Sequence, residues 1–418
     1  MRLLFVSDVS IRAVLGGAER VLFEQATRLA AAGHSVHLIT RRRPEHRSRR
    51  EAIRGVEEIR CDFVPDGGLR STTKTWRQAR RHLARLHALE PFDCLNIHQP
   101  LTAHGVVAQA SACGIRMVYT CHSLSAEEYL SRHVGQGLTG RLLRRMNAAI
   151  RHLIEGRVLR RCDRIVALSR YTREKLQRVH GIPEDRVAVI PGGVDLVRFR
   201  PVHDPLAARE ELSIPRGRFV LLTVRNLVPR MGLERLVLSM QTVAAAIPHS
   251  LLVIGGSGPL GDRLKAMVDR LGLGGNVRLV GFIPEEILHR YYQMADLFVL
   301  PSIDLEGFGM VTVEALACGV PVLGTPVGGT HEILARLDER LLLKDGRPES
   351  MALGVIDCHR RFHARGEDAC RMRQRCRMLA EKCYSWNHNV AALEQILAGA
   401  RPQAVGPLAS LHKETVRP

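Results

Sequence analysis

Aromatic residues are scarce in this sequence. Phe, Trp and Tyr together make up 4% of its 418 residues. Proteins that bind single-stranded nucleic acid stack bases on such rings, and the chain carries no recognition motif of a nucleic-acid-binding fold. This scarcity argues against nucleic acid as a partner.

Long apolar runs are also absent. No run reaches the roughly 20 residues that a membrane-spanning helix requires. The apolar start Met1–Val6 has the composition of a short signal peptide, but Ser7, Asp8 and Arg12 interrupt it at once. We interpret it as a buried first strand and expect a cytoplasmic protein.

The ten cysteines form no Cys-x-x-Cys pair. A large cytosolic enzyme keeps such thiols reduced, so no disulfide framework is expected. One C-terminal cluster contains several thiols and imidazoles: Cys358, His359, His363, Cys370, Cys376 and Cys383. Its spacing matches no usual zinc-ligand pattern, so we expect no metal site.

Acidic residues are outnumbered by basic ones. The chain has 61 Lys and Arg against 42 Asp and Glu, a net charge of +19 with histidine neutral. Residues 1–200 carry a net charge of +16 and the remainder +3. A basic first half favours an anionic partner, such as a membrane surface, an acidic glycan or nucleic acid, of which the last is disfavoured above.

Short apolar runs alternate with helical segments along the whole chain, which is longer than one hydrophobic core usually supports. Strands are expected at Leu3–Ser7, Val36–Thr40, Asp93–Ile97, Met117–Thr120 and Arg164–Leu168. After a polar stretch from Phe199, they recur at Phe219–Val224, Ser250–Gly255, Val277–Val280, Leu297–Leu300 and Val320–Gly324. The pattern predicts two α/β domains with doubly wound parallel sheets, over residues 1–200 and 201–384.

The most informative segment follows the expected strand Leu297–Leu300. Gly307 and Gly309 allow a close backbone turn, and a helix is expected to begin near Met310. Free amide groups at a helix start attract phosphate oxygens, and ligands of doubly wound sheets lie outside the carboxyl ends of the strands. The segment therefore predicts a phosphate-binding turn.

Two carboxylates flank this turn, Glu306 in the loop and Glu314 in an otherwise apolar helix. A buried carboxylate needs a partner. Glu314 is placed to accept hydrogen bonds from ribose hydroxyls beside a phosphate site. Glu306 is placed to reach a sugar on the far side of a diphosphate.

Glu306 and Glu314, with seven residues between them and Gly-Phe-Gly after the first, resemble the Glu-x7-Glu signature of retaining glycosyltransferases of the family 4 type. The resemblance extends over about residues 1–398. It implies the GT-B fold, in which two Rossmann-like domains face across a cleft. It also implies a C-terminal helix at about residues 385–398 that packs back on the first domain, followed by a tail over 399–418.

Further segments are similar to the family in places with known roles. Gly16-Gly17 matches the first loop, which approaches the donor diphosphate. His122 matches a histidine beside the reacting sugar, and the stretch Val189–Asp195 resembles the one before the interdomain linker. Phe282 and Ile283 lie in a segment whose family counterpart meets the nucleotide base with its backbone.

One motif departs from the family pattern. Asn226 and Met231 stand where the family commonly has the arginine and lysine that bind the diphosphate, and Arg225 and Arg230 each stand one place earlier. Guanidinium groups bind phosphate with two bonds, so we expect Arg230, and Arg225 as well, to supply the positive charge. Alternatively, both are surface arginines and cleavage relies on backbone amides.

The resemblance implies transfer of a sugar from a nucleotide diphosphate donor to a hydroxyl, with retained anomeric configuration and without a covalent nucleophile. The expected catalytic residues are Glu306, His122 and Arg230. The expected donor-binding residues are Gly16, Gly17, Arg225, Arg230, Phe282, Ile283, Glu306, Gly307, Phe308, Gly309 and Glu314. We expect no metal or other cofactor, and a lipid-linked or polysaccharide glycan as acceptor. The alternative is a GT-B nucleotide-sugar epimerase or a non-catalytic GT-B protein.

Three other features stay open in the sequence. His98 ends an expected strand, and both a structural and a functional role fit it. The glycine-rich segment Gly255–Pro259 fits a tight turn as well as a phosphate-binding loop. The segment Arg141–Arg161 places apolar residues at helical spacing among seven arginines. Such a helix can lie on an anionic bilayer at the inner face of the plasma membrane; alternatively, its apolar stripe packs into the first domain.

Overall fold

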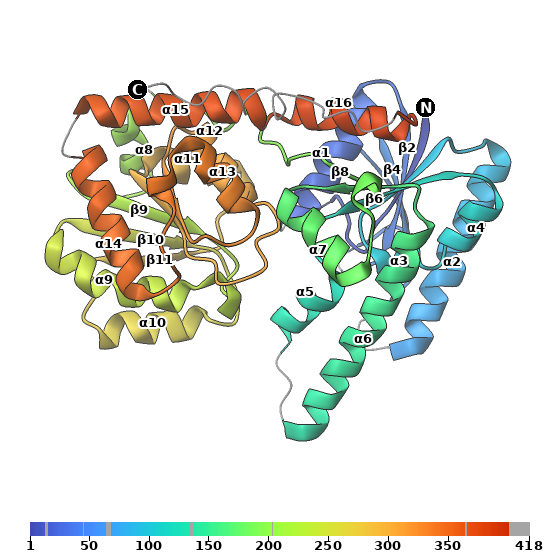
Figure 1. Ribbon diagram of the computed structural model, residues 1–418, viewed down its shortest axis with the longest axis horizontal. Helices are drawn as coiled ribbons and strands as arrows, with labels where there is room; N and C mark the ends of the chain where they lie inside the picture. Colours follow the sequence, from blue (N-terminus) through green and yellow to red (C-terminus); the bar gives the residue numbers. More distant parts are fainter. Residues whose placement is uncertain are drawn as a thin grey trace. The chain divides into compact units, whose positions relative to one another are not determined.

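The computed structural model describes residues 1–12, 16–44, 46–63, 68–133, 137–202, 204–363 and 366–400. They form two compact units (Figure 1). Unit 1 contains Met1–Gly192 and the C-terminal segment from Trp386, and unit 2 contains Gly193–Ser385. Most of the predicted tail, residues 401–418, lies outside the described residues.

The sheet of unit 1 has eight strands within the described residues. They are β1 (Arg2–Val6), β2 (Ser35–Arg41), β3 (Arg50–Ile53), β4 (Val56–Cys61), β5 (Cys94–Ile97), β6 (Arg116–Cys121), β7 (Arg164–Ala167) and β8 (Val187–Val189). Their order is β3-β4-β2-β1-β5-β6-β7-β8, and β3 alone among them pairs antiparallel, with β4.

Helices cover both faces of this sheet. They are α1 (Gly17–Ala31), α2 (Gly68–Leu89), α3 (Pro100–Ala103), α4 (Val107–Ala112), α5 (Ser125–Arg132), α6 (Gly137–Arg161), α7 (Arg170–His180) and α16 (Trp386–Leu397), with a 3-10 turn η1 (Glu184–Arg186). The sequence Leu3–Val6 of strand β1 is continuously apolar because both faces of the strand are buried. Leu3 and Phe5 join the core on the α16 side, and Leu4 and Val6 join the core that includes residues of α2 and α6.

The C-terminal helix α16 packs on unit 1 through apolar and polar contacts. Val390, Leu393 and Ile396 belong to the same core as Leu3 and Phe5 of β1. Beside them, the side-chain Oδ1 of Asn389 accepts a hydrogen bond of 2.9 Å from Nε2 of Gln25 in α1, and its Nδ2 donates one of 2.6 Å to the carbonyl of Pro191. A polar pair inside an apolar contact sets the register of α16 on α1.

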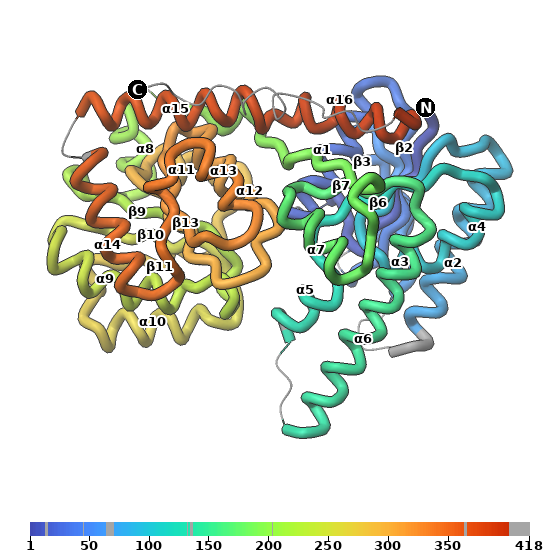
Figure 2. The backbone as a smooth tube through the Cα atoms, in the orientation of Figure 1, coloured from blue at the N-terminus to red at the C-terminus, as the bar shows by residue number. Residues whose placement is uncertain are grey.

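Unit 2 has a five-stranded, wholly parallel sheet within the described residues. Its strands are β9 (Phe219–Val224), β10 (Ser250–Gly255), β11 (Val277–Gly281), β12 (Leu297–Leu300) and β13 (Val322–Gly324), in the order β11-β10-β9-β12-β13. Helices and turns surround it: α8 (Pro205–Glu211), η2 (Pro229–Met231), α9 (Leu233–Ala246), α10 (Gly261–Arg270), α11 (Glu285–Met294), α12 (Met310–Ala317), α13 (Gly329–Leu337), η3 (Glu339–Leu341), α14 (Pro348–Cys358), η4 (His359–His363) and α15 (Gly366–Cys383). Figure 2 traces the backbone through both units.

The predicted fold class, two doubly wound α/β units, is confirmed. Unit 2 begins at Gly193, a few residues before the predicted boundary at residue 200. The backbone amide of Val194 donates a 2.7 Å hydrogen bond to the carbonyl of Tyr384 in unit 2, which ties this segment to unit 2. Arg377 of α15 also donates to the carbonyls of Leu196 and Phe199, at 3.1 and 2.8 Å. In the described part of the chain, no helix combines the length and apolar character needed to cross a bilayer.

Candidate active site

The turn predicted to bind phosphate lies between β12 and α12 in unit 2. Gly309 precedes the first residue of α12 with a φ of 94°, in the left-handed region. A Cβ atom at Gly309 would lie 2.6 Å from Oγ1 of Thr330 and 3.1 Å from Oγ1 of Thr312. Only glycine fits here without displacing these hydroxyls.

The two threonines add polar groups to the start of α12. Thr312 belongs to α12 and Thr330 to α13, and both are fully buried. Within the described residues, neither hydroxyl has a hydrogen-bond partner. Buried polar groups without partners are rare in folded proteins, and beside a helix N-terminus they suit the oxygens of a phosphate group.

Glu306 is held in a closed network of side chains in the loop before this turn. It forms an ion pair with Arg225, which follows β9, and accepts a 2.8 Å hydrogen bond from Oγ of Ser302. Arg225 also donates to Oγ of Ser302 at 3.0 Å. Both Arg225 and Glu306 are only 8% exposed. Each charge is therefore compensated by the other away from bulk water.

The backbone of Glu306 is fixed as well. Its carbonyl accepts a 2.9 Å hydrogen bond from the amide of Gly329, at the start of α13. A Cβ atom at Gly328 would lie 1.9 Å from the same carbonyl oxygen, so glycine is required for this close approach. The loop that carries Glu306 is thus pinned to α13 and oriented before any ligand arrives.

Arg225 and Arg230, in the segment that differs from the family pattern, have different surroundings. Arg225 is buried, paired with Glu306 and in contact with Sδ of Met231 at 2.7 and 3.2 Å. Arg230, in η2, is partly exposed and donates a 3.3 Å hydrogen bond to the carbonyl of Leu305. Arg230 is the arginine whose charge lies beside the Glu306 loop while its side chain still reaches solvent.

Glu314 is buried in α12 and has a partner within unit 2. The hydroxyl of Tyr292, a fully buried residue of α11, donates a 2.7 Å hydrogen bond to Oε2 of Glu314. This bond fixes the orientation of the carboxylate. The sequence provided no signal for Tyr292, because it lies on a different helix.

The four other residues predicted to meet the donor in unit 2 lie on two loops. Phe282 follows β11 and is 60% exposed, so its ring is available for contact, whereas Ile283 is buried against Gly255. Phe308 is buried, with its ring centroid 5.8 Å from that of Tyr384. Gly307 precedes it in the turn.

The glycine-rich segment after β10 is explained by packing. A Cβ atom at Gly256 would lie 1.8 Å from the carbonyl oxygen of Arg225, and one at Gly258 would lie 2.6 Å from that of Leu227. These glycines allow the loop to lie directly against the chain that carries Arg225. The tight-turn interpretation is sufficient for this segment.

In unit 1, the structure brings His98 and His122 together. They follow the neighbouring strands β5 and β6, and Nδ1 of His98 lies 3.0 Å from Nε2 of His122. Burial lowers the pKa of His122 to about 4, and burial followed by the charge of His122 lowers the pKa of His98 well below 6.5. Both rings are therefore neutral at pH 7, and one donates a hydrogen bond to the other.

Gly16 and Gly17 lie at the start of α1. Gly17 is the first helical residue, and Gly16 precedes it with an extended backbone. The three residues before them, 13–15, lie outside the described residues. The helix start leaves amide groups available at this position, as a diphosphate-binding loop requires.

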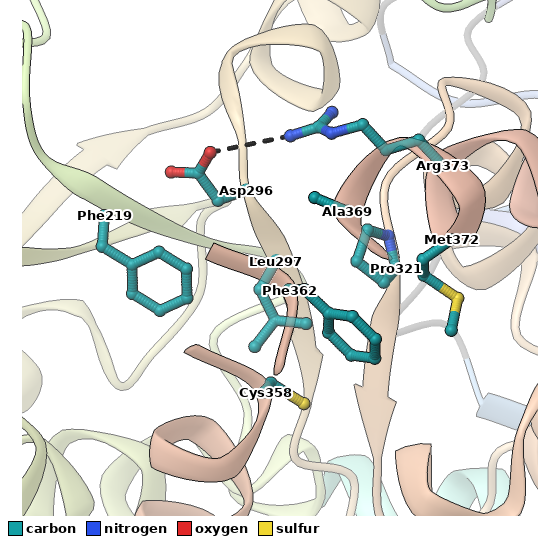
Figure 3. A pocket seen from close by; sticks show the side chains of 9 residues that line it. All are labelled: Phe219, Asp296, Leu297, Pro321, Cys358, Phe362, Ala369, Met372 and Arg373. Carbon is teal, nitrogen blue, oxygen red and sulfur yellow. Dashed lines mark ion pairs between the residues drawn. The ribbon is translucent and has the colours of Figure 1, made fainter. Parts of the chain in front are cut away.

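A separate cavity of about 140 Å³ in unit 2 lies away from these residues (Figure 3). Phe219 and Leu297, the first residues of β9 and β12, line it together with Cys358 and Met372. It therefore opens at the amino ends of the strands, whereas Glu306 follows the carboxyl end of β12. We assign it no part in donor binding.

Two Rossmann-like units, each with a doubly wound sheet, give the chain the GT-B fold. Residues 15–198 match the family described as Glycosyltransferase Family 4, and residues 206–360 match Glycosyl transferases group 1. The chain belongs to the family 4 type of glycosyltransferases. The predicted family is confirmed, whereas the Glu-x7-Glu assignment of Glu306 and Glu314 stays a prediction.

Two relatives illustrate the range of this similarity. The D-inositol 3-phosphate glycosyltransferase of Segniliparus rotundus is 29% identical over 351 residues, 80% of this chain and 74% of that protein. The GDP-mannose-dependent alpha-(1-6)-phosphatidylinositol monomannoside mannosyltransferase of Mycolicibacterium smegmatis is 35% identical over 176 residues, 41% of this chain and 46% of that protein.

Solved structures share the fold at lower identity. Sucrose-phosphate synthase from Thermosynechococcus elongatus has a TM-score of 0.74 and 23% identity, covering 94% of this chain and 98% of that one. HepE from Anabaena, in complex with UDP-glucose, has a TM-score of 0.73 and 18% identity, covering 95% and 99%.

Proposed function

We propose that this glycosyltransferase moves a sugar from a nucleoside diphosphate donor to a hydroxyl acceptor with retention of anomeric configuration. The observation that carries the proposal is the turn before α12. There Gly309 and the unpartnered hydroxyls of Thr312 and Thr330 surround the start of a helix, and Glu306 and Glu314 lie on either side. A donor diphosphate would bind at the helix start and its ribose would lie toward Glu314.

The proposed chemistry relies on positioning and charge. A leaving diphosphate develops negative charge, which Arg230 and the amides at the start of α12 would stabilise. Glu306 is already paired with Arg225, so its role is to orient the donor sugar rather than to form a covalent bond. The acceptor hydroxyl would attack the face from which the diphosphate leaves, and a phosphate oxygen would take its proton.

The residues of unit 1 would serve the sugar and the acceptor. His122 is neutral, so it would contact the donor sugar as a hydrogen-bonding group without adding charge. His98 holds the ring of His122 by a 3.0 Å contact and acts as its positioning residue. Gly16 and Gly17 would let the first loop approach the donor diphosphate. No metal or other cofactor has a part in this proposal.

The donor and acceptor classes are supported by the relatives. The mannosyltransferase of Mycolicibacterium smegmatis is named for GDP-mannose as donor and a phosphatidylinositol mannoside as acceptor, and HepE was solved with UDP-glucose. We propose a nucleotide sugar as donor and a lipid-linked or polysaccharide glycan as acceptor.

We also propose that helix α6 attaches the protein to an anionic membrane surface. Six large apolar residues of α6 are between 51% and 82% exposed: Leu138, Leu142, Leu143, Met146, Ile150 and Leu153. The apolar stripe is therefore not packed into unit 1, which contradicts the alternative considered from the sequence. The single carboxylate of α6, Glu155, is buried, whereas seven arginines occupy the helix. A helix with exposed apolar residues and arginines suits an anionic bilayer surface.

A product-release assay tests the transferase proposal. Nucleotide sugars that raise the melting temperature are incubated with and without a glycolipid extract, and release of nucleoside diphosphate is measured. Release that depends on acceptor supports transfer, and an α-configured product from an α-configured donor, seen by NMR, supports retention. Release without acceptor, or epimerised donor, supports the epimerase alternative, and binding of donor with no release supports a non-catalytic protein. Glu349→Gln, an exposed carboxylate of α14, is the matched control for Glu306→Gln.

A further inference from the structure

A second cavity lies in unit 1, at the edge of the sheet formed by β3 and β4. Its volume is about 440 Å³, and its lining residues are Arg49, Arg50, Ile59, Arg60, Gln78, Arg81, His82 and Arg85. Five of these eight residues are arginines and none is acidic. The cavity is separate from the residues proposed for sugar transfer.

The sequence and the strand pairing both concentrate arginine here. In α2, Gln78, Arg81, His82 and Arg85 follow the spacing of one helix face. Across from them, the antiparallel pairing of β3 with β4 places Arg50 opposite Ile59, so that the start of β3 lies beside the end of β4. The face of α2 that packs on the core is apolar, with Ala79, Leu83 and Leu86 buried, whereas Gln78 and His82 are half-buried beside it and Arg81 and Arg85 are exposed at the rim of the cavity.

Carboxylates around the cavity compensate some of these arginines. Arg60, whose side chain is fully buried, pairs with Glu51 at 2.7 Å and with Glu58 at 2.8 Å. Arg49 pairs with Asp62 at 3.0 Å, and Arg50 lies 3.8 Å from Glu57.

Two arginines of α2 remain without such a partner. Arg81 and Arg85 form no ion pair with any carboxylate in the part of the chain that the structure describes. The cavity therefore holds an excess of positive charge.

Two further observations indicate an anion. Among the described residues, Nε of the buried Arg60 has no hydrogen-bond partner. Burial and then the charges of Arg50, Arg85 and Arg49 lower the pKa of His82, which favours the neutral ring. A bound anion would complete the hydrogen bonding of the arginines and offset the repulsion that keeps His82 unprotonated.

We propose that this cavity binds a phosphate group, as a phosphomonoester or diphosphate. Guanidinium groups bind phosphate oxygens with two parallel hydrogen bonds, and several arginines around one cavity match the charge of a dianion. Such a group can come from the headgroup of a phosphate-bearing lipid or from a soluble phosphate compound. The proposal goes beyond sugar transfer, and its test uses no donor and no turnover.

The first experiment measures binding of pyrophosphate by calorimetry to the full chain carrying Arg230→Ser, which removes the arginine proposed above to bind the donor diphosphate. The cavity variant is Arg81→Ser with Arg85→Ser, and the matched control is Arg77→Ser with Arg80→Ser, two exposed arginines of the same helix that do not line the cavity. We expect the cavity variant to weaken binding by about tenfold or more, in line with the loss of charge-assisted hydrogen bonds, and the control to bind as the parent does. Equal weakening in both variants, or no binding by the parent, would overturn the proposal.

A second readout follows the ring of His82 by NMR, assigned with His82→Gln. Pyrophosphate should raise the pKa of His82 in the parent and in the control, and leave it unchanged in the cavity variant. A pKa of His82 that does not respond to saturating pyrophosphate places the anion elsewhere and overturns the assignment.

Vesicles distinguish the two sources of phosphate. Vesicles with phosphatidic acid, a phosphomonoester, are compared with phosphatidylserine vesicles of equal charge. A preference for phosphatidic acid that the cavity variant loses supports a lipid headgroup. Pyrophosphate binding without that preference supports a soluble phosphate compound.

Discussion

The guanidinium of Arg225 and the carboxylate of Glu306 form a nearly buried ion pair, although they lie 81 residues apart in the sequence. The pair forms because β9 and β12 are neighbours in the sheet of unit 2, and each residue follows the carboxyl end of its strand. Ser302 bonds to both partners and closes the network. The arginine that departs from the family pattern is therefore tied to the proposed catalytic glutamate.

Removing one member of this pair should cost more than removing both charges. Arg225→Met leaves a buried carboxylate uncompensated and should lower the free energy of unfolding by about 3 kcal/mol, whereas Arg225→Met with Glu306→Gln should recover part of that loss. Urea unfolding of the parent, both single variants and the double variant measures the coupling. Additive single effects would show that the pair contributes no stability as a unit. In turnover, Glu306→Ala should cost about 10² to 10³, as for the loss of one preorganised electrostatic contact.

The hydroxyls of Thr312 and Thr330 should have opposite effects on stability and on donor binding. Valine in place of either residue removes a buried hydroxyl without a partner and keeps the shape, so the free energy of unfolding should rise, by up to about 1 kcal/mol. If the hydroxyls bind the diphosphate, affinity for the nucleoside diphosphate should fall by about tenfold in the same variants. Calorimetry with the nucleotide and urea unfolding measure the two effects. Unchanged nucleotide affinity would remove these threonines from the donor site.

Tyr292 should act on donor binding through Glu314. Tyr292→Phe deletes the 2.7 Å hydrogen bond to Glu314 without changing the ring, so the carboxylate loses one of the contacts that orient it. We expect Glu314→Ala to weaken donor affinity, with a smaller effect on turnover, because ribose contacts are similar in the ground state and transition state. Tyr292→Phe should produce a weaker version of the same change in KM. A lower kcat at unchanged KM in either variant would argue against a ribose-binding role.

The sequence predicted ten of the thirteen described strands but missed β3, β4 and β8, and it did not predict the residue pairs at the candidate site. Strand β1 is a continuous apolar run because both its faces are buried, and Gly309 marks a turn by its residue type alone. In contrast, the contacts of Arg225 with Glu306 and of His98 with His122 depend on which strands are neighbours. Strand order is decided by tertiary packing, which no local pattern encodes.

The neutral histidines of unit 1 should make stability depend on pH. The unfolded chain protonates His122 near pH 6.5, whereas the folded protein does so only near pH 4. Stability from this group is therefore fully present above pH 6.5 and is lost as the pH falls toward 4, by up to about 1.4 kcal/mol for each pH unit. Urea unfolding at pH 7.5, 6 and 5 should show a smaller loss for His122→Gln than for the parent. The exposed His331→Gln serves as the control and should behave as the parent.

Helix α6 should attach the protein to anionic vesicles through its exposed apolar residues. Leu142→Ser with Met146→Ser removes two side chains that are 60% and 51% exposed, so the melting temperature should stay unchanged. Affinity for vesicles with anionic lipid should fall at least about tenfold, because apolar burial in the bilayer interface is lost. The matched control is Leu353→Ser with Met378→Ser, exposed apolar residues of unit 2 that should not affect sedimentation.

Salt and lipid charge separate the two contributions of α6. The arginines act through screened electrostatics, so higher ionic strength should weaken binding to anionic vesicles in the parent and the control alike. Neutral vesicles should bind weakly, because the apolar residues alone provide little affinity without the surface charge. Equal binding to neutral and anionic vesicles, or binding to neither, would contradict a membrane-facing role for α6. An unpartnered apolar helix face would then need a protein partner, which size-exclusion chromatography of the parent and the Leu142/Met146 variant would detect as a change of oligomeric state.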